Sequence, residues 1–197
     1  MNIHLIAEGQ LELPVGRKLI EHCGHSIGRE YLLQGCGNIK SKAYKYASLA
    51  VGGDGVLVLT DFMDSRCDCV PQALVEYRAE TIGRHSFLYR FAMPELESWL
   101  LADVAGLSDF LRVARSKIPD KPEEVPDPKR TLVNLARSSK KRAVREDIVP
   151  PEGNSGVVGR LYVPRLTEFV EKFWDIDAAI QHASSLARCV RRLRELQ

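Results

Sequence analysis

The sequence contains little that would place it in a membrane-spanning, disulfide-bonded or strongly basic class of protein. Its apolar runs fall short of the roughly 20 residues that a membrane-spanning helix needs, and Met1-Asn2-Ile3-His4 does not open a secretory signal. The five cysteines are odd in number and scattered, which argues against a disulfide framework. The net charge is only +2, so charge alone demands no nucleic-acid partner. We therefore expect a cytoplasmic protein without a membrane segment.

Short apolar runs alternate with helical patterns over the first half of the 197 residues. The runs predict strands at 2–7, 31–34, 55–60 and 86–92, and residues 70–83 are predicted to form a helix. The run 55–60 is almost entirely apolar, which is typical of a strand that is buried on both faces of a parallel sheet. The alternation predicts an α/β fold with a mostly parallel sheet of about four strands, flanked by helices.

The second half of the chain contains helical patterns and no convincing strand. Four prolines within residues 118–129 predict an extended surface segment, because proline interrupts helices. Trp99 and Trp174 occupy apolar helix positions and are expected in the core. The sequence thus predicts an α/β domain over residues 1–103 and a helical C-terminal extension over residues 104–197, packed on it as a single folding unit.

Acidic residues stand just after three of the predicted strands, where open α/β sheets have their active crevice. Carboxylates that converge there repel one another, and a divalent cation such as Mg²⁺ or Mn²⁺ relieves that repulsion. The alternative for each acid is to cap a helix or to favour its dipole, most clearly for Glu12 and Glu95. The acids are Glu8 and Glu12 after the first strand, Asp61 and Asp64 after the third, and Glu95 and Glu97 after the fourth.

The order of these acids resembles a known fold. A strand followed by Glu8-Gly9-x-x-Glu12, and a later strand followed by Asp61-x-x-Asp64, resemble the TOPRIM domain, the metal-binding fold of topoisomerases, primases and OLD-type nucleases. Nearly the whole chain resembles the bacterial domain-of-unknown-function family 4276, which is regarded as TOPRIM-like. The blocks that carry this resemblance are Glu95-Leu96-Glu97-Ser98-Trp99-Leu100-Leu101-Ala102-Asp103, Pro126-Asp127-Pro128-Lys129, Trp174-Asp175 and Ser184-Ser185-Leu186-Ala187-Arg188.

The resemblance implies a cofactor, Mg²⁺ or Mn²⁺, and a role for each acid. Glu8 would be a metal ligand or the general base, and Asp61 would be the principal ligand. The family pattern is usually Asp-x-Asp, whereas position 63 here is Met63, so a second metal site stays open. The implied metal ligands are Glu8, Glu12, Asp61, Asp64 and Glu97.

Basic residues supply candidate contacts to the phosphates of a nucleic acid. The alternative is a set of solvated faces, which the charges near the end of the last helix favour. Cys67 and Cys69 have Cys-x-Cys spacing next to the acidic loop. Cys23, His22 and His25 are the residues that could complete a zinc site with them, but plain loop cysteines are favoured over that site. The candidate nucleic-acid-binding residues are Lys129, Arg137, Lys140, Lys141, Arg142 and Arg188.

Two classes of function follow from these patterns. The leading hypothesis is a Mg²⁺- or Mn²⁺-dependent phosphoryl-transfer enzyme, a nuclease that cuts phosphodiesters. By resemblance to OLD-type proteins, it would work with a separate ABC-class or AAA-type ATPase in a bacterial defence against phage or in DNA processing. The competing hypothesis is a non-catalytic TOPRIM-like module that binds or regulates a partner, with its acids used as helix caps.

Overall fold

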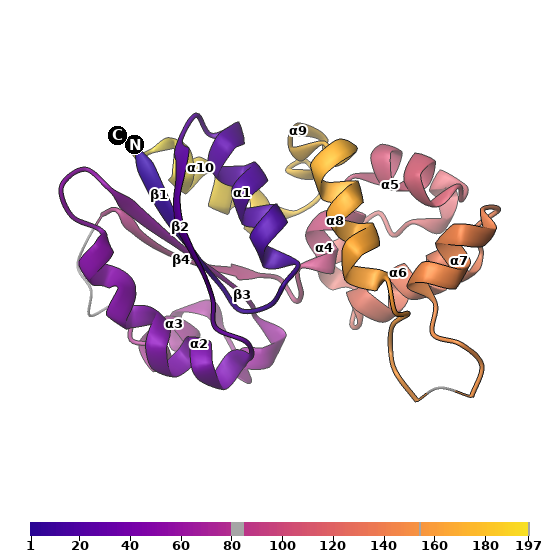
Figure 1. Cartoon of the computed structure of the whole chain (residues 1–197), viewed down its shortest axis with the longest axis horizontal. Coiled ribbons are helices and arrows are strands. Elements are labelled where there is room, and N and C mark those ends of the chain that lie inside the picture. The colour runs from indigo at the N-terminus through magenta and orange to yellow at the C-terminus, as the bar shows by residue number, and fades with distance from the viewer. Residues whose placement is uncertain (80–84, 154, 197) are drawn as a thin grey trace. The chain divides into compact units, whose positions relative to one another are not determined.

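A computed structural model describes residues 1–79, 85–153 and 155–196 of the chain. The chain forms two compact units, one of residues Met1–Leu96 with Ser185–Gln197, the other of residues Glu97–Ser184. This division differs from the one expected at residue 103, because the last helix returns to the N-terminal unit and the helix after the fourth strand already belongs to the second. Figure 1 traces the two units by residue number.

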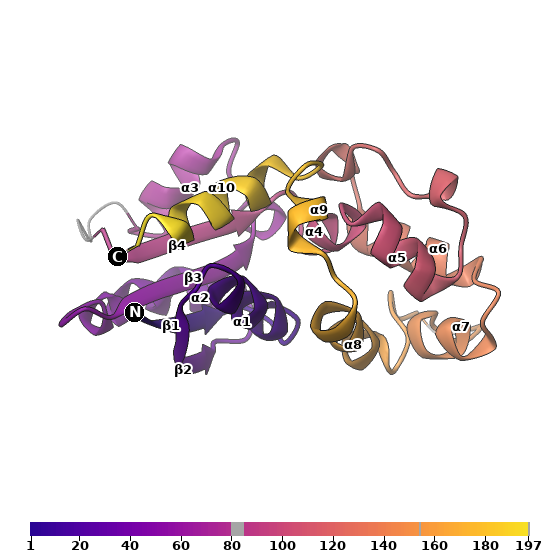
Figure 2. The same ribbon diagram turned by 90° about the horizontal axis from the view of Figure 1, so that it is seen from above.

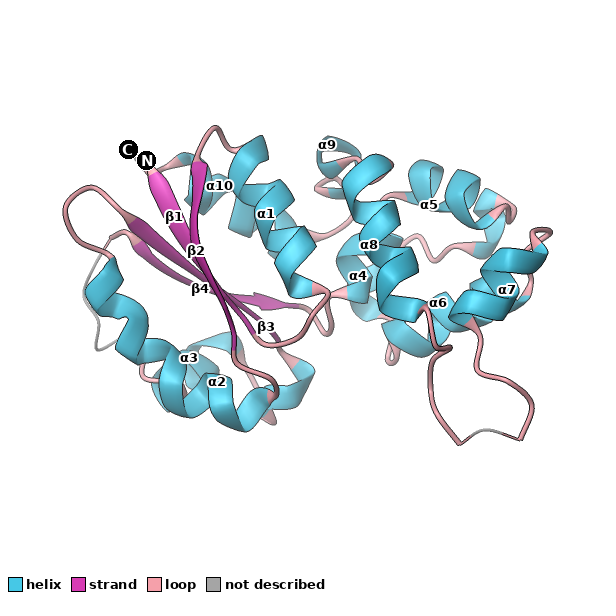
Figure 3. Cartoon of the chain, in the orientation of Figure 1, coloured by secondary structure: helices cyan, strands magenta, loops and turns pink. Residues whose placement is uncertain are grey.

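The first unit contains a four-stranded parallel sheet, so the α/β fold class predicted from the sequence is confirmed (Figure 3). The strands are β1 (Asn2–Ala7), β2 (Ser26–Leu32), β3 (Gly55–Asp61) and β4 (Phe87–Ala92). Their order is β2-β1-β3-β4, so β1 and β3 are the central strands of the sheet. Every residue of β3 is buried, as its apolar run predicts.

Helices cover both faces of this sheet (Figures 1 and 2). Helices α1 (Glu12–His22) and α10 (Ser184–Arg194) share one face, where the His25 ring, just beyond α1, hydrogen bonds to the Leu193 carbonyl at 2.8 Å. Helices α2 (Cys36–Lys42) and α3 (Val70–Glu76) cover the other face. The core under α2 and α3 includes Ile6, Ile39, Val58, Tyr77 and Phe91.

Several elements of this unit begin or end away from their predicted positions. Strand β2 starts at Ser26 rather than residue 31, because an edge strand with polar, half-exposed residues has no apolar run to mark it. Helix α2 and the 3₁₀ turn η1 (Ala43–Leu49) lie in a stretch for which the sequence predicts no element. Helix α3 ends at Glu76, short of the predicted residue 83, and residues 80–83 lie outside the described part of the chain.

The second unit is helical, and aspartates begin three of its helices. The side chains of Asp103, Asp127 and Asp175 accept backbone N–H groups at the starts of α5, α6 and α9, which satisfies donors that a helix leaves free. The described helices are α4 (Glu97–Leu101), α5 (Val104–Leu111), α6 (Pro128–Arg137), α7 (Arg142–Ile148), α8 (Tyr162–Lys172) and α9 (Ile176–Ala179).

Both tryptophans lie in the core of this unit, as expected. Trp99 is fully buried and Trp174 is 2% exposed, and the Trp174 indole N–H donates to the Trp99 carbonyl at 3.2 Å. The proline-rich segment is less extended than predicted, because it includes the 3₁₀ turn η5 (Pro122–Glu124), and its Ile118 and Pro122 side chains are buried. In the part of the chain that the structure describes, no helix is long and apolar enough to cross a membrane.

Candidate functional site

The carboxyl ends of β1 and β3 bring two of the predicted acids to one edge of the sheet. Because the strands are parallel neighbours, Glu8 directly after β1 lies beside Thr60, next to the last residue of β3. The Glu8 N–H donates to the Leu59 carbonyl at 3.2 Å, and the Thr60 hydroxyl donates to the Glu8 carboxylate. Glu8 is only 6% exposed. The sheet therefore holds a carboxyl group in a buried, defined orientation.

The pKa of Glu8 is raised above its ordinary value. Burial is the largest cause, because it disfavours the charged form, and the negative charge and hydrogen-bonding contact of the Asp64 carboxyl raise the pKa further. Hydrogen bonds from the Thr60 hydroxyl and from the Asp61 backbone act in the opposite direction. Glu8 and Asp64 therefore form a pair of carboxyl groups in contact, and the Glu8 carboxyl holds a proton more readily than an isolated glutamate.

A 3₁₀ turn brings Asp64 to this pair. Residues Met63–Ser65 form the turn η2 immediately after β3. The Phe62 N–H donates to the Ala92 carbonyl and the Met63 N–H donates to the Pro94 carbonyl, each at 2.9 Å, which ties the turn to the end of β4. The Asp61-x-x-Asp64 spacing, with one residue more than Asp-x-Asp, thus places the second aspartate beside Glu8.

Asp61 and Glu12 lie close to this pair along the chain but make other contacts. The Asp61 Oδ1 atom accepts the Leu96 backbone N–H at 2.7 Å, so this carboxylate anchors the chain beyond β4. Glu12 is 6% exposed at the start of α1, and a Cβ on Gly9 would lie 2.8 Å from its Oε2 atom. Gly9 therefore leaves the space into which the Glu12 carboxylate folds.

Glu97 belongs to the second unit and is part of a buried polar cluster there. The Tyr162 hydroxyl donates to Glu97 Oε1 at 2.8 Å, and the Lys129 Nζ atom lies 3.7 Å from the same oxygen. Glu97 is 2% exposed. The structure thus pairs a residue predicted to bind metal with one predicted to contact nucleic acid.

The predicted metal ligands do not form a ready-made cage. Among residues 1–79, 85–153 and 155–196, no group of three or more His, Cys, Asp and Glu side chains is arranged to hold a metal ion. What the structure does bring together is Glu8 with Asp64, and Glu8 with the backbone of Asp61. The donor atoms at this edge of the sheet are oxygens.

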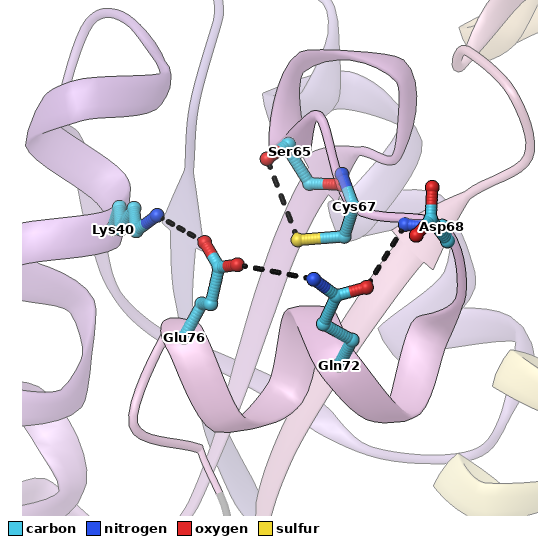
Figure 4. A network of polar contacts seen from close by, with 6 residues as sticks. All are labelled: Lys40, Ser65, Cys67, Asp68, Gln72 and Glu76. Carbon is cyan, nitrogen blue, oxygen red and sulfur yellow. Dashed lines mark hydrogen bonds and ion pairs between the residues drawn. The ribbon is translucent and has the colours of Figure 1, made fainter.

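A network of polar contacts holds the loop that follows Asp64 (Figure 4). The Cys67 thiol donates to the Ser65 carbonyl at 3.4 Å, and the Asp68 N–H donates to the Gln72 side chain at 3.1 Å. Gln72 and Lys40 both contact the Glu76 carboxylate, whose pKa is lowered chiefly by its hydrogen bond from Lys40. The network joins the loop to α3 and α2.

The two loop cysteines have separate places in this arrangement. Cys67 packs partly buried against the core under α2 and α3, whereas Cys69 is exposed and immediately precedes α3. Cys23 and His25, two of the residues weighed as partners for a zinc site, contact backbone carbonyls of α10, with which α1 covers the other face of the sheet. The cysteines therefore do not converge with those partners.

Four of the predicted nucleic-acid contacts are exposed in the second unit. The sequence predicts a loop over residues 137–145, but Arg142 begins α7 and forms an ion pair with Glu146 at 2.7 Å. Arg137 donates to the Asn134 side chain at 2.9 Å. Lys141 lines a cavity of about 310 Å³. The exposed cations therefore differ in whether they already form hydrogen bonds or ion pairs with other side chains.

Lys140 lines a cavity of about 490 Å³ with two cations that the sequence analysis missed, Arg112 and Lys117. The Lys140 N–H donates to the Arg112 carbonyl at 3.4 Å, which joins the two segments. Arg188 belongs to the first unit, where it is exposed on α10. Its positive charge lowers the pKa of Arg90, although burial of Arg90 is the larger cause.

A second set of missed residues lies beside β2. Tyr31, Lys42, Lys45 and Tyr46 line a cavity of about 420 Å³ in the first unit. The signal in the sequence is the alternation of basic and aromatic residues in Lys40-Ser41-Lys42-Ala43-Tyr44-Lys45-Tyr46. That pattern is typical of nucleic-acid contacts.

The chain matches no protein-family model, no curated protein and no solved structure.

Proposed function

We propose that the protein is a Mg²⁺- or Mn²⁺-dependent phosphoryl-transfer enzyme, a nuclease whose cation binds between Glu8 and Asp64, beside Asp61. The observation that carries this proposal is the buried Glu8 carboxyl in contact with Asp64 at the carboxyl end of a parallel sheet. Two carboxylates in contact repel each other when both are ionised, and a divalent cation between them removes that cost. Oxygen donors suit hard cations of this kind.

The residues around this pair have distinct roles in the proposed chemistry. A bound cation would polarise the phosphodiester and generate a hydroxide nucleophile from water. Glu8 would be either a ligand of this cation or, where it does not bind the metal directly, the base that accepts a proton from the attacking water. The Thr60 hydroxyl and the Asp61 N–H fix the orientation of the Glu8 carboxylate. The Leu96 N–H does the same for Asp61.

A partner ATPase belongs to the same proposal. The resemblance to OLD-type proteins supports a separate ABC-class or AAA-type ATPase, acting with this chain in phage defence or DNA processing. This part of the proposal rests on the resemblance alone.

Isothermal titration of Mn²⁺ into the metal-free full chain tests the cation site. We expect micromolar-to-millimolar binding that is lost in Glu8→Gln and in Asp61→Asn, because each substitution removes a negative oxygen donor. Asp68→Asn is the matched control, since Asp68 is an exposed acid of the same loop whose N–H contacts Gln72. Wild-type protein that binds no Mn²⁺, or variants that bind it as the wild type does, would contradict the proposal.

The second candidate function is a non-catalytic binding or regulatory module. The contacts of Asp61 with the Leu96 N–H and of Glu97 with Tyr162 and Lys129 favour it, because they use carboxylates to hold the fold together. In that case Asp61→Asn lowers the free energy of unfolding, and Mn²⁺ has no effect on the melting temperature of the wild type. The two functions therefore differ in whether Mn²⁺ stabilises the folded protein.

A further inference from the structure

The cavity beside β2 combines aromatic rings with exposed lysines. We call it the Tyr31 cavity; its volume is about 420 Å³, within the roughly 300–1,000 Å³ that is usual for small-ligand sites. The residues that line it come from β2, from the last residue of α2 and from the 3₁₀ turn η1. They are Tyr31, Lys42, Lys45, Tyr46, Ser48 and Leu49.

The two tyrosines form a rigid aromatic surface. The ring centroids of Tyr31 and Tyr46 lie 4.6 Å apart with an interplanar angle of 51°. Both side chains are half-buried and pack against the core under α2 and α3, so their rings are held in place before any ligand arrives. A preorganised ring at the wall of a cavity is suited to stack with a nucleobase, since every base has a π face.

The two lysines supply positive charge that is not used within the fold. Lys42 and Lys45 are exposed, and neither forms an ion pair with another residue in the described part of the chain. Their neighbour Lys40 differs, because it contacts the Glu76 carboxylate and lies 5.5 Å above the Tyr77 ring. Two lysines next to an aromatic pair match a phosphate backbone next to a base.

The Tyr31 cavity and the Glu8 carboxyl lie on the same face of the sheet. Tyr31 pairs with Ile6 of β1, and both pack against the core under α2 and α3. Glu8 stands two residues after Ile6, so strand alternation directs its side chain to the same face. The loop after β2 also reaches Glu8, because the Gly35 N–H donates to the Glu8 carbonyl at 3.3 Å.

We propose that the Tyr31 cavity binds single-stranded nucleic acid, with a base stacked on Tyr46 and Tyr31 and the adjoining phosphates on Lys42 and Lys45. A nucleic-acid strand bound in this way extends along the edge of the sheet, and its next phosphodiester lies towards Glu8 and Asp64. That the bound strand leads to Glu8 and Asp64 rests on the proposed nuclease function, whereas the binding of single-stranded nucleic acid in the cavity does not. A duplex fits poorly, because its bases are already stacked and paired.

Fluorescence anisotropy of a labelled 12-nucleotide oligothymidylate, measured with the full chain in EDTA, tests the binding without any metal. We expect Lys42→Ala/Lys45→Ala to weaken binding and to make the slope of log K against log salt less negative by roughly 1.4, at about 0.7 for each phosphate contact on a single strand. Tyr46→Ala is expected to weaken binding roughly ten-fold, whereas Tyr46→Phe keeps the ring and binds as the wild type does.

The matched control is Lys172→Ala, which removes one exposed positive charge from α8 of the second unit. It should bind the oligonucleotide as the wild type does, and thermal melting of each variant checks that it is folded. Wild-type protein that does not bind, equal binding by the lysine variant, or equal losses in Tyr46→Ala and Tyr46→Phe would overturn the proposal. The oligonucleotide titration is made in EDTA, which removes divalent cations, so its result does not depend on the proposed metal site. If the protein binds no Mn²⁺ but binds the oligonucleotide through the Tyr31 cavity, the metal site is rejected and the proposal for the cavity stands.

Discussion

The carboxyl groups of Glu8 and Asp64 are in hydrogen-bonding contact at the carboxyl end of the sheet. One acid follows β1 and the other lies in the turn after β3, so two separate segments form the pair. Burial of Glu8 adds to the cost of ionising both groups. The pair thus has unfavourable electrostatic energy when both groups are ionised.

The pair predicts a pH dependence of stability. The pKa of Glu8 is higher in the folded protein than its ordinary value of 4.5, so the folded state binds more protons than the unfolded state between the two values. The free energy of unfolding should therefore fall as the pH rises through this window. Glu8→Gln removes the titrating group, so the free energy of unfolding of this variant should not fall with pH in the same way. Urea unfolding from about pH 4 to about pH 8 measures the difference.

Glu21→Gln is the control for this pH series. Glu21 is an exposed residue of α1, and the substitution makes the same chemical change away from the pair. Its stability profile should run parallel to that of the wild type. If the Glu8→Gln profile also runs parallel to the wild type, the pKa of Glu8 is not raised in the folded protein.

The hydroxyl of Tyr162 should stabilise the second unit through Glu97. Tyr162→Phe leaves a carboxylate that is 2% exposed without one of its donors, which costs about 1–3 kcal/mol of unfolding free energy. Urea unfolding measures this loss. Tyr44→Phe is the comparison, because it removes an exposed hydroxyl that accepts from Arg78 and should change stability by less than about 0.5 kcal/mol. Similar losses of unfolding free energy in both variants would show that the buried hydrogen bond to Glu97 stabilises the protein no more than an exposed one.

Gly16 should be required for the close packing of α1 on β1. A Cβ at Gly16 would lie 2.6 Å from Leu5 Cδ1 and 2.7 Å from Leu5 Cδ2. Gly16→Ala is therefore expected to destabilise the protein by about 1–3 kcal/mol through overpacking, despite the better helix propensity of alanine. In Gly37→Ala, where the new Cβ would meet no described atom within 4 Å, stability should stay equal or rise by up to about 1 kcal/mol. A stable Gly16→Ala protein in the same thermal-melting series would contradict this packing argument.

The basic cavity of the second unit should contribute to nucleic-acid binding through charge. Replacing Arg112, Lys117 and Lys140 with alanine should make the salt slope for a short DNA duplex less negative by roughly 2.7, because each phosphate that the protein neutralises adds about 0.9 to the slope. Arg142→Ala should change the slope little, since Arg142 is already paired with Glu146. Anisotropy titrations over a range of salt concentrations give these slopes. An unchanged slope in the triple variant would identify the cavity as an ordinary solvated surface.

Much of the sheet could be predicted from the sequence because β1, β3 and β4 have short, mostly apolar runs. β3 and β4 lie within about one residue of their predicted bounds, and Glu8 and Asp61 stand at strand ends as expected. Strand β2 could not be located in the same way, because its residues are only half-buried or exposed and include Arg29 and Glu30, which interrupt any apolar run. Helix α2 likewise contributes little more than Ile39 to the core, so its sequence shows no clear periodicity.

The sequence by itself determined the fold class and the strand ends at which acids occur. Only the tertiary structure decided which side chains meet: Asp64 reaches Glu8 because a 3₁₀ turn follows β3, and Tyr31 meets Tyr46 because η1 packs beside β2. It also decided that Glu97 contacts Lys129. The physical reason is that periodicity reports which face of an element is buried, whereas contacts between distant segments depend on turns and packing that no local pattern encodes.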